Sequence, residues 1–220
     1  ERRLVNQQSA FIDASIVYGT SEETLRALRD PSHPELLLVP KGILPPSLNP
    51  DADGCSDPRS SQFCFRAGDG RVNQQPGIAS LQILYARQHN RLARELRRLH
   101  PHWETEIVFQ EARRVPSDFP GNPRILIAQH QHIIYSEYVP MMLGPLHSAS
   151  LGLSSGVDLH PNGVWRSQYD PKRDPRIMVE FTTAAYRFGH GLIDDFSLVD
   201  RHGGVAPYSL SDRFFNVQDF

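Results

Sequence analysis

The sequence is 220 residues long, which is enough for one or two domains with a buried core. Hydrophobic residues make up 39% and charged residues 22%, the ordinary balance of a globular protein. The 23 basic and 25 acidic side chains give a formal net charge of −2, which argues against a basic surface for nucleic acid or anionic membrane. No apolar run approaches the roughly 18 residues that span a bilayer. We therefore expect no nucleic-acid partner and no membrane span.

An early polar segment carries oxygen atoms on alternate residues. Ser9 and Ser15 offer hydroxyl groups, Asp13 offers a carboxylate and Phe11 offers its backbone carbonyl. Alternate residues of an extended segment point the same way, and an all-oxygen set suits Ca²⁺. A short polar turn is the alternative that the spacing leaves open.

A short helix is predicted to follow, with Ser21 as its N-cap, Glu22 and Glu23 in its first turn, and its end before Asp30-Pro31. Residues 31–76 hold 8 of the 18 prolines and show little periodicity, so we expect mostly extended loop there.

Two cysteines, Cys55 and Cys64, bracket a polar stretch within this loop. They predict either a local disulfide formed in an oxidising compartment or two small buried thiols.

A glycine-rich turn precedes the longest helical pattern. The run Gly68-Asp69-Gly70-Arg71 is not a G-x-G-x-x-G motif and follows no strand, so nucleotide binding is not predicted. Arg71 either faces a cavity or pairs with a carboxylate.

Helical periodicity dominates the next part of the chain, and the expected fold class is mainly α. A helix over about 77–100 has a mostly apolar stripe, formed by Leu81, Leu84, Tyr85, Gln88, Leu92, Glu95, Leu96 and Leu99. Arg87, Arg91, Arg94 and Arg98 lie on another, solvated face. Further helices are predicted over about 103–114, 125–138 and 174–190, the last with Asp174 as its cap and Pro175 at its first position. No run shows convincing strand alternation.

Residues 115–124 interrupt this helical pattern. Pro116, Pro120 and Pro123 lack a backbone donor and would each cost roughly 3 kcal/mol inside a helix, so the helix must break here. The segment is interpreted as an insertion, which is either a genuine loop or the product of a misplaced splice boundary.

His190 has the most distinctive context among the ten histidines. It lies late in a predicted helix between Gly189 and Gly191, so a flat ligand can approach closely because neither neighbour has a side chain. A structural role is the alternative. His130 and His132 are two residues apart and make a poor metal pair on a helix, and His89 is predicted to be a packed or hydrogen-bonded structural group.

Four segments together resemble the animal haem peroxidase family. In the family's order they are SAFIDASIVYGT, CFRAGDGRVNQQP, LYARQHNRLARELRRLHPHW and AAYRFGHGLI, and their detail is most similar to the arthropod and peroxidasin-type branches. The resemblance implies a secreted protein with haem b and Ca²⁺, in which hydrogen peroxide oxidises the haem, which then oxidises a halide, a phenol or a tyrosine side chain. The alternative is a non-catalytic extracellular module of this family, either haem-binding or adhesive.

The resemblance also assigns roles to single residues. His190 matches the proximal histidine that ligates the haem iron, Arg71 matches the distal arginine that polarises peroxide, and Arg187 matches an arginine near a haem propionate. Gln74 stands where mammalian members commonly carry a glutamate that is ester-linked to haem, and an amide cannot form that ester. The remaining matches are a calcium loop, with Ser9 where threonine is commoner, and a small disulfide loop: Ser9, the carbonyl of Phe11, Asp13 and Ser15, and Cys55 with Cys64.

Parts of the family's site lie beyond the matched segments. The distal histidine, the aspartate calcium ligand beside it and an acidic ester partner lie upstream in the family, and the asparagine that orients the proximal imidazole lies downstream. The chain opens without Met or a signal-peptide pattern and closes on a partly apolar stretch, as an internal piece would. We therefore expect residues 1–220 to form a partial peroxidase domain with little or no activity alone.

Overall fold

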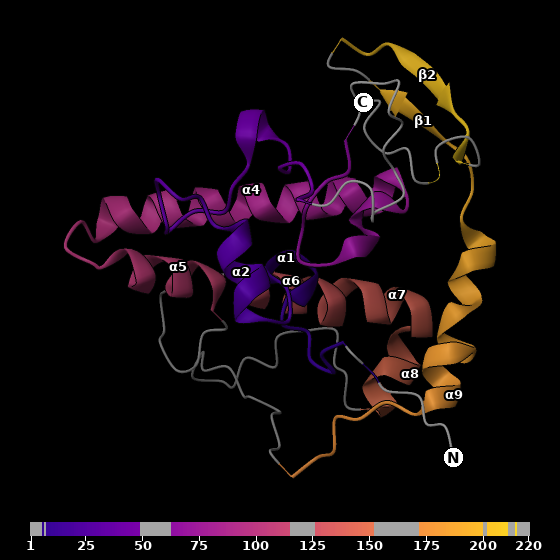
Figure 1. The fold of residues 1–220 in the computed structure, drawn as a ribbon. Helices are drawn as coiled ribbons and strands as arrows, with labels where there is room; N and C mark the ends of the chain where they lie inside the picture. Colours follow the sequence, from indigo (N-terminus) through magenta and orange to yellow (C-terminus); the bar gives the residue numbers. More distant parts are fainter. Residues whose placement is uncertain are drawn as a thin grey trace, which may run out of the picture.

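A computed structural model describes residues 6, 8–48, 63–114, 126–151, 172–199, 202–210 and 214. Helices dominate this part of the chain (Figure 1), which confirms the mainly α fold class. The α-helices are α1 (Ser15–Tyr18), α2 (Glu22–Leu28), α4 (Pro76–Leu99), α5 (Thr105–Arg113), α6 (Leu126–Ile133), α7 (Val139–Leu143), α8 (Pro145–Ser150) and α9 (Val179–Thr183). The 3₁₀ and π segments are η1 (Pro40–Gly42), η2 (Gly70–Asn73), η3 (Ile134–Tyr138) and η4 (Ala185–Leu192). None of the helices described here has the length and apolar character needed to cross a bilayer.

The helix α4 is the longest element, and α5 runs beside it (Figure 1). Pro76 takes the first helical position, where its missing N–H costs nothing, and the Gln75 side chain accepts a 2.6 Å hydrogen bond from the amide of Gly77. These two features explain why the helix begins within a residue of the predicted start.

The buried face of α4 differs from the apolar stripe seen in the sequence. Leu92 and Leu96 of that stripe are buried as predicted, but Leu81 and Leu84 are 55% and 61% exposed. Most of the other residues of α4 that face the core are small or polar. Small side chains let neighbouring segments approach the helix axis closely, which a row of leucines would prevent. The predicted arginine face is exposed, as expected. The buried residues of α4 are Pro76, Ala79, Gln82, Ala86, His89, Asn90, Leu92, Ala93 and Leu96.

The predicted short helix is confirmed as α2. The Ser21 hydroxyl accepts a 3.1 Å hydrogen bond from the amide of Thr24 and so satisfies a donor that the first helical turn leaves free. The described parts of the proline-rich region, 31–48 and 63–69, contain only the short η1 as helix. The loop prediction therefore holds for them, while η2 adds one helical turn before α4.

The predicted end of the second long helix is confirmed, whereas the interruption that follows it stays a prediction. The helix α5 ends at Arg113 and α6 begins at Leu126, while residues 115–124, with the predicted insertion, lie outside the described residues. Beyond α6 the helical path continues through η3 and α7 to Leu143, past the predicted end near Tyr138. The wider π turn of η3 precedes Pro140, which cannot donate to a preceding carbonyl.

The prediction of one helix over 174–190 is wrong in detail. The α-helix begins only at Val179 and gives way to the 3₁₀ segment η4 after Ala184. The Asp174 carboxylate is held by the Arg176 guanidinium at 2.5 Å, in an extended segment. The hydroxyls of Thr182 and Thr183 both donate to the carbonyl of Val179, which competes with the helical ladder.

A small hairpin was not anticipated. Strands β1 (Phe196–Val199) and β2 (Val205–Tyr208) pair antiparallel, with Phe196 opposite Tyr208 and Val199 opposite Val205. The turn contains Gly203 at φ 82°, a left-handed conformation that glycine adopts without steric cost.

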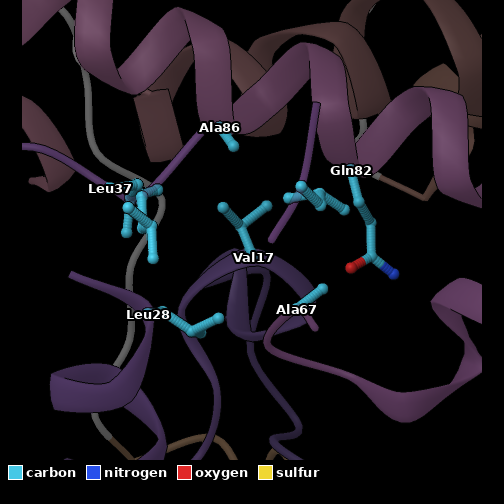
Figure 2. A pocket seen from close by; sticks show the side chains of 8 residues that line it. Val17, Leu28, Leu37, Ala67, Gln82 and Ala86 are labelled. Atoms are coloured by element: carbon cyan, nitrogen blue, oxygen red, sulfur yellow. The ribbon is translucent and has the colours of Figure 1, made fainter. Parts of the chain in front are cut away.

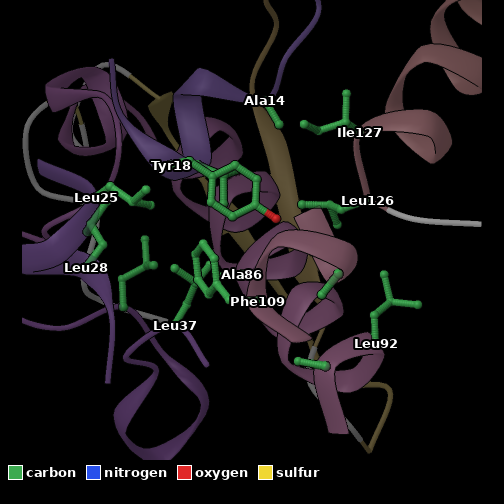
Figure 3. Packing of buried hydrophobic residues seen from close by; sticks show 14 of the residues in the cluster. Ala14, Tyr18, Leu25, Leu28, Leu37, Ala86, Leu92, Phe109, Leu126 and Ile127 are labelled. Atoms are coloured by element: carbon green, nitrogen blue, oxygen red, sulfur yellow. The ribbon is translucent and has the colours of Figure 1, made fainter. Parts of the chain in front are cut away.

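The centre of the core is a buried polar contact surrounded by aromatic rings. The Tyr18 hydroxyl lies 2.9 Å from His89 Nδ1, and His89 Nε2 lies 3.2 Å from the carbonyl oxygen of Glu35. A carbonyl only accepts, so Nε2 carries the proton and Nδ1 accepts from the tyrosine. Phe109 packs at the edge of Tyr18 with 6.1 Å between ring centroids, and Figure 3 shows both rings among the aliphatic side chains. The predicted structural role of His89 is confirmed.

Burial sets the ionisation of this pair. Desolvation lowers the pKa of His89 to about 4 and raises the pKa of Tyr18 well above its ordinary value. Both groups are therefore neutral at physiological pH, which is the state that their hydrogen bond requires.

The amide side chain of Asn90 holds the proline-rich loop against α4. The Asn90 side chain accepts from the amide of Leu37 and donates to its carbonyl, both at 2.8 Å. The space between this loop, α1 and α4 is nearly filled, since the cavity that Val17, Ala67 and Gln82 help to line measures about 10 Å³ (Figure 2). A cavity of that size is no larger than one water molecule needs, so we assign no ligand to it.

Replacing Tyr18 by Phe tests the importance of the buried contact. The variant Tyr18→Phe leaves His89 Nδ1 buried without a donor, so we expect the free energy of unfolding to fall by about 1–3 kcal/mol. Tyr135, which is 45% exposed, provides the matched control, and Tyr135→Phe should change stability by less than about 0.5 kcal/mol. Urea unfolding of both variants in the full-length protein measures the difference, and equal stabilities would contradict the assignment.

Candidate functional site

Two of the predicted oxygen-bearing residues of the early polar segment, Ser9 and Ser15, hydrogen-bond to Asp13. Partial burial raises the pKa of Asp13, but hydrogen bonds from the Ser9 and Ser15 side chains and from the Ser15 amide outweigh it and hold the pKa below its ordinary value. The Ser15 amide donates to Asp13 Oδ1 at 2.9 Å, and the Phe11 amide donates to Ser9 Oγ at 3.2 Å. The carboxylate thus stays ionised amid hydroxyl oxygens, an arrangement that a hard cation can bind.

The chain makes a sharp turn directly after this carboxylate. Ala14 adopts φ 55° and is buried, and the amide of Val17 donates to its carbonyl at 2.8 Å to begin α1. The neighbouring Ile12 carbonyl accepts a 2.8 Å hydrogen bond from Gln131 on α6. The polar segment is therefore fixed from both sides by the helical core.

Gly68 joins the polar segment to the arginine turn. A Cβ atom at Gly68 would lie 2.4 Å from the Gly19 nitrogen, 2.6 Å from the Ser15 carbonyl oxygen and 2.6 Å from the Val17 carbonyl carbon. All three neighbours are backbone atoms, which cannot move aside as a flexible side chain does. The two segments pack backbone to backbone at this point, and only glycine fits there.

Arg71 is held by Asp69. The guanidinium meets both carboxylate oxygens, with Nε 2.9 Å from Oδ1 and a terminal nitrogen 2.5 Å from Oδ2, and the Arg71 amide also donates to Oδ1. The hydrogen bonds from Arg71 hold the pKa of Asp69 below its usual range although burial opposes them, and the carboxylate raises the pKa of Arg71. The carboxylate side chain is 7% exposed and that of Arg71 is 60% exposed. A buried anion thus orients an accessible cation.

His190 is exposed and presents one particular ring nitrogen. Its Nδ1 lies 2.9 Å from the carbonyl oxygen of Arg187, which only accepts, so Nδ1 carries the proton. Nε2 is then the unprotonated nitrogen with a free lone pair, the form in which imidazole ligates a metal. A Cβ at Gly189 or at Gly191 would meet no atom within 4 Å, so the space beside the ring is open to a planar group.

The remaining predicted site residues, Arg187 and Gln74, lie close in sequence to His190 and Arg71, respectively. The Arg187 guanidinium is exposed and its Nε donates to the carbonyl of Thr182 at 3.2 Å. Gln74 is half-buried at the end of η2. Tyr186, next to Arg187, adds a smaller electrostatic contribution to the raised pKa of Arg71, so η4 lies near the arginine turn.

Of the two cysteines, Cys64 lies within the described residues. Cys64 is fully buried, and its carbonyl accepts a 2.7 Å hydrogen bond from the amide of Ser47. Cys55 lies outside the described residues, so the predicted pairing stays a prediction.

A different kind of metal site would consist of clustered His, Cys, Asp or Glu side chains. Within the described ranges no three His, Cys, Asp or Glu side chains gather as a metal site. His130 is half-buried against the Tyr85 ring, with 5.1 Å between the two ring centroids.

The sequence left open a carboxylate partner for Arg71 but did not identify it as Asp69, and it gave no role to Gly68. The signal for Asp69 was its position two residues before Arg71, where an aspartate can accept from both the backbone and the side chain of the arginine. No local signal marked Gly68, because its neighbours Ser15 and Gly19 are some fifty residues away in sequence.

Comparison with known proteins identifies the family. Residues 1–220 match the animal haem peroxidase family over their whole length, so the chain belongs to that family. The chorion peroxidase of Drosophila melanogaster is 37% identical over 211 residues, which cover 94% of this chain and 24% of that protein. The human peroxidasin homolog is 36% identical over 201 residues, which cover 88% of this chain and 12% of that protein.

A solved structure supports the same assignment. Peroxidase A from Dictyostelium discoideum superposes with a TM-score of 0.65 and 30% identity, covering 94% of this chain and 36% of that one. The chain therefore spans about a quarter or less of these two curated relatives and about a third of the solved structure.

Two glycine variants test the close contact between the segments. Gly68→Ala forces a Cβ into three backbone atoms and should destabilise the protein by about 1–3 kcal/mol or more. Gly70→Ala is the matched control, because a Cβ there meets nothing within 4 Å. Thermal unfolding of both variants decides the matter, and a Gly68→Ala protein as stable as Gly70→Ala would show that the segments are not in contact.

Proposed function

We propose that the protein to which this chain belongs is a haem peroxidase, with His190 as the iron ligand. The observation that carries the proposal is the hydrogen bond from His190 Nδ1 to the Arg187 carbonyl, which leaves Nε2 unprotonated and exposed. A Cβ at Gly189 or Gly191 would meet no atom within 4 Å, so a flat macrocycle would find room beside the two glycines. The backbone carbonyl also fixes the tautomer and the orientation of the ring, as partners of metal-bound histidines do.

Arg71 is proposed to act on the peroxide. An exposed guanidinium presents several donors and a permanent positive charge, which stabilise negative charge that develops as an O–O bond breaks. Because the buried Asp69 carboxylate fixes the guanidinium in advance, little reorganisation is needed during the reaction. The haem, when bound, would transfer the oxidising equivalents of hydrogen peroxide to the substrate, while the residues of this chain bind and orient.

The substrates we propose are hydrogen peroxide and a halide, a phenol or a tyrosyl side chain. Arg187 is proposed to pair with a haem propionate, since its exposed guanidinium lies three residues before His190. Gln74 has an amide, so we propose that haem b is held without an ester at this position. Residues 1–220 include no match to a distal histidine, so we expect this chain alone to have little activity.

Calcium, a disulfide and secretion complete the proposal. The ionised Asp13 with Ser9, Ser15 and the Phe11 carbonyl is proposed to bind Ca²⁺, and the convergence of hydroxyls on the carboxylate supports it. A bond between Cys55 and Cys64 is proposed for a protein that matures in an oxidising compartment.

The experiment that tests the function uses the full-length protein and two histidine variants. We expect bound haem, with its strong near-ultraviolet absorption band, and peroxide-dependent oxidation of iodide, a phenol or tyrosine. His190→Ala should lose most of the haem and the activity, whereas His102→Ala, at an exposed turn, should retain both. A wild-type protein that binds haem without oxidising any of these substrates would favour the non-catalytic module instead. Unchanged haem content in His190→Ala would remove His190 from the iron.

The role of Asp69 can be tested separately. Asp69→Asn removes the charge that orients Arg71, so kcat/KM for peroxide should fall by about ten- to a hundredfold while haem content stays the same. Asp174→Asn is the matched control, because Asp174 makes the same carboxylate contacts with Arg176 on an exposed segment. If both variants retain wild-type kcat/KM, Asp69 does not position the arginine.

A further inference from the structure

A second cavity, which has charged side chains in its lining, lies far along α4 from the arginine turn. It measures about 320 Å³ and is lined by His33, Glu35, Leu36, Arg94 and Arg97. Arg94 is 18 residues after Pro76, which places it about 27 Å along the helix axis from the start of α4. The cavity is therefore separate from the group that includes Asp69 and Arg71, and its volume lies at the lower end of the range for small-molecule sites.

The charges that line this cavity do not cancel. Arg97 lies 3.8 Å from the Glu35 carboxylate, whose side chain is 14% exposed, and Arg97 also donates to the carbonyl of Trp103. Within the described part of the chain, Arg94 makes no ion pair and no side-chain hydrogen bond. One carboxylate against two guanidinium groups leaves the cavity with one unbalanced positive charge, on Arg94.

The wall opposite α4 is fixed in place before any ligand arrives. The Asp30 carboxylate accepts from the amides of Ser32 and His33 at 2.8 and 3.2 Å, and the Leu36 amide donates to the His33 carbonyl at 2.8 Å. The Glu35 carbonyl is also the acceptor for the buried His89. A preformed wall spares a ligand the entropy of ordering a loop.

We propose that this cavity binds a small hydroxylated monoanion, such as a uronic acid or a sugar sulfate. Arg94 binds the carboxylate or sulfate group through paired hydrogen bonds, which the guanidinium geometry favours. Glu35 accepts from a ligand hydroxyl, the His33 imidazole provides a further polar contact, and Leu36 contacts the apolar face of the sugar ring. A dianion is disfavoured because the Glu35 carboxylate faces the same space.

Four sugars of similar size test the charge requirement by isothermal titration calorimetry on the full-length protein. Glucuronate and glucose 6-sulfate should each bind at one site per chain. Neutral glucose and dianionic glucose 6-phosphate should bind at least roughly tenfold more weakly, since each lacks the matched charge. If neither monoanion binds saturably, or if glucose 6-phosphate binds more tightly than both, the proposal is wrong.

Matched arginine variants separate the cavity from general surface charge. Arg94→Gln should weaken glucuronate binding by roughly tenfold or more. Arg91→Gln removes the same charge one turn earlier on the same exposed face of α4, where Arg91 contacts Gln88 and does not line the cavity, and should leave the affinity unchanged. Equal weakening by both variants would assign the effect to surface charge and overturn the site.

A third variant tests the role of the acidic wall. Glu35→Gln keeps the backbone carbonyl that holds His89 but removes the negative charge, so glucose 6-phosphate should then bind at least as tightly as glucuronate. Continued rejection of the dianion by this variant would contradict the proposed charge selection. Neither result depends on haem, so the proposed peroxidase function and this site can fail independently.

Discussion

The arrangement of this chain depends on one neutral hydrogen-bonded series, from the Tyr18 hydroxyl through the His89 ring to the Glu35 carbonyl. It joins three segments that are distant in sequence: α1, the middle of α4 and the proline-rich loop. Tyr18 and His89 are fully buried, so the cost of leaving either of them unpaired is high. Because the imidazole is neutral and has one donor and one acceptor, it can connect the two partners only in the tautomer that the carbonyl imposes.

Both candidate sites follow from this constraint. Since α1 is held against α4, the backbone of Ser15 and Gly19 meets Gly68, and that contact sets the turn in which Asp69 orients Arg71. On the other side of His89, the Glu35 carbonyl holds the loop that forms the wall of the basic cavity. One long helix thus supports a site near each of its ends, and rigid elements of this kind position side chains more accurately than loops do.

Much of the fold could be predicted because its signals are local. The Ser21 cap and the Pro76 helix start both act within one turn of chain. Leu92 and Leu96 on the buried face of α4 were predicted, but the rest of that face was not, because it depends on the close approach of α1 and the loop, which favours small residues. The late start of α9 was also missed, since Arg176 holds Asp174 and the threonine hydroxyls compete for the Val179 carbonyl.

The candidate site, like the fold, could be predicted only as far as its signals are local. The sequence pointed to His190 and Arg71 through their glycine-rich neighbours, but it could not show which imidazole nitrogen is free or that Asp69 fixes the arginine. Those features arise from contacts with a backbone carbonyl and a buried carboxylate, and their geometry is set by the local backbone path rather than by residue type.

The central series is tested most directly by the pH dependence of stability in the wild-type full-length protein and in His89→Gln. Burial lowers the pKa of His89 to about 4, below its value in the unfolded chain, so the unfolded state takes up a proton first as the pH falls. Stability should therefore be complete above about pH 6.5 and decline towards pH 4, with this residue accounting for about 3 kcal/mol. A glutamine can accept from Tyr18 and donate to Glu35 without titrating, so His89→Gln should lack this part of the decline. Parallel stability curves for the two proteins between pH 6.5 and 4 would contradict a buried, neutral His89.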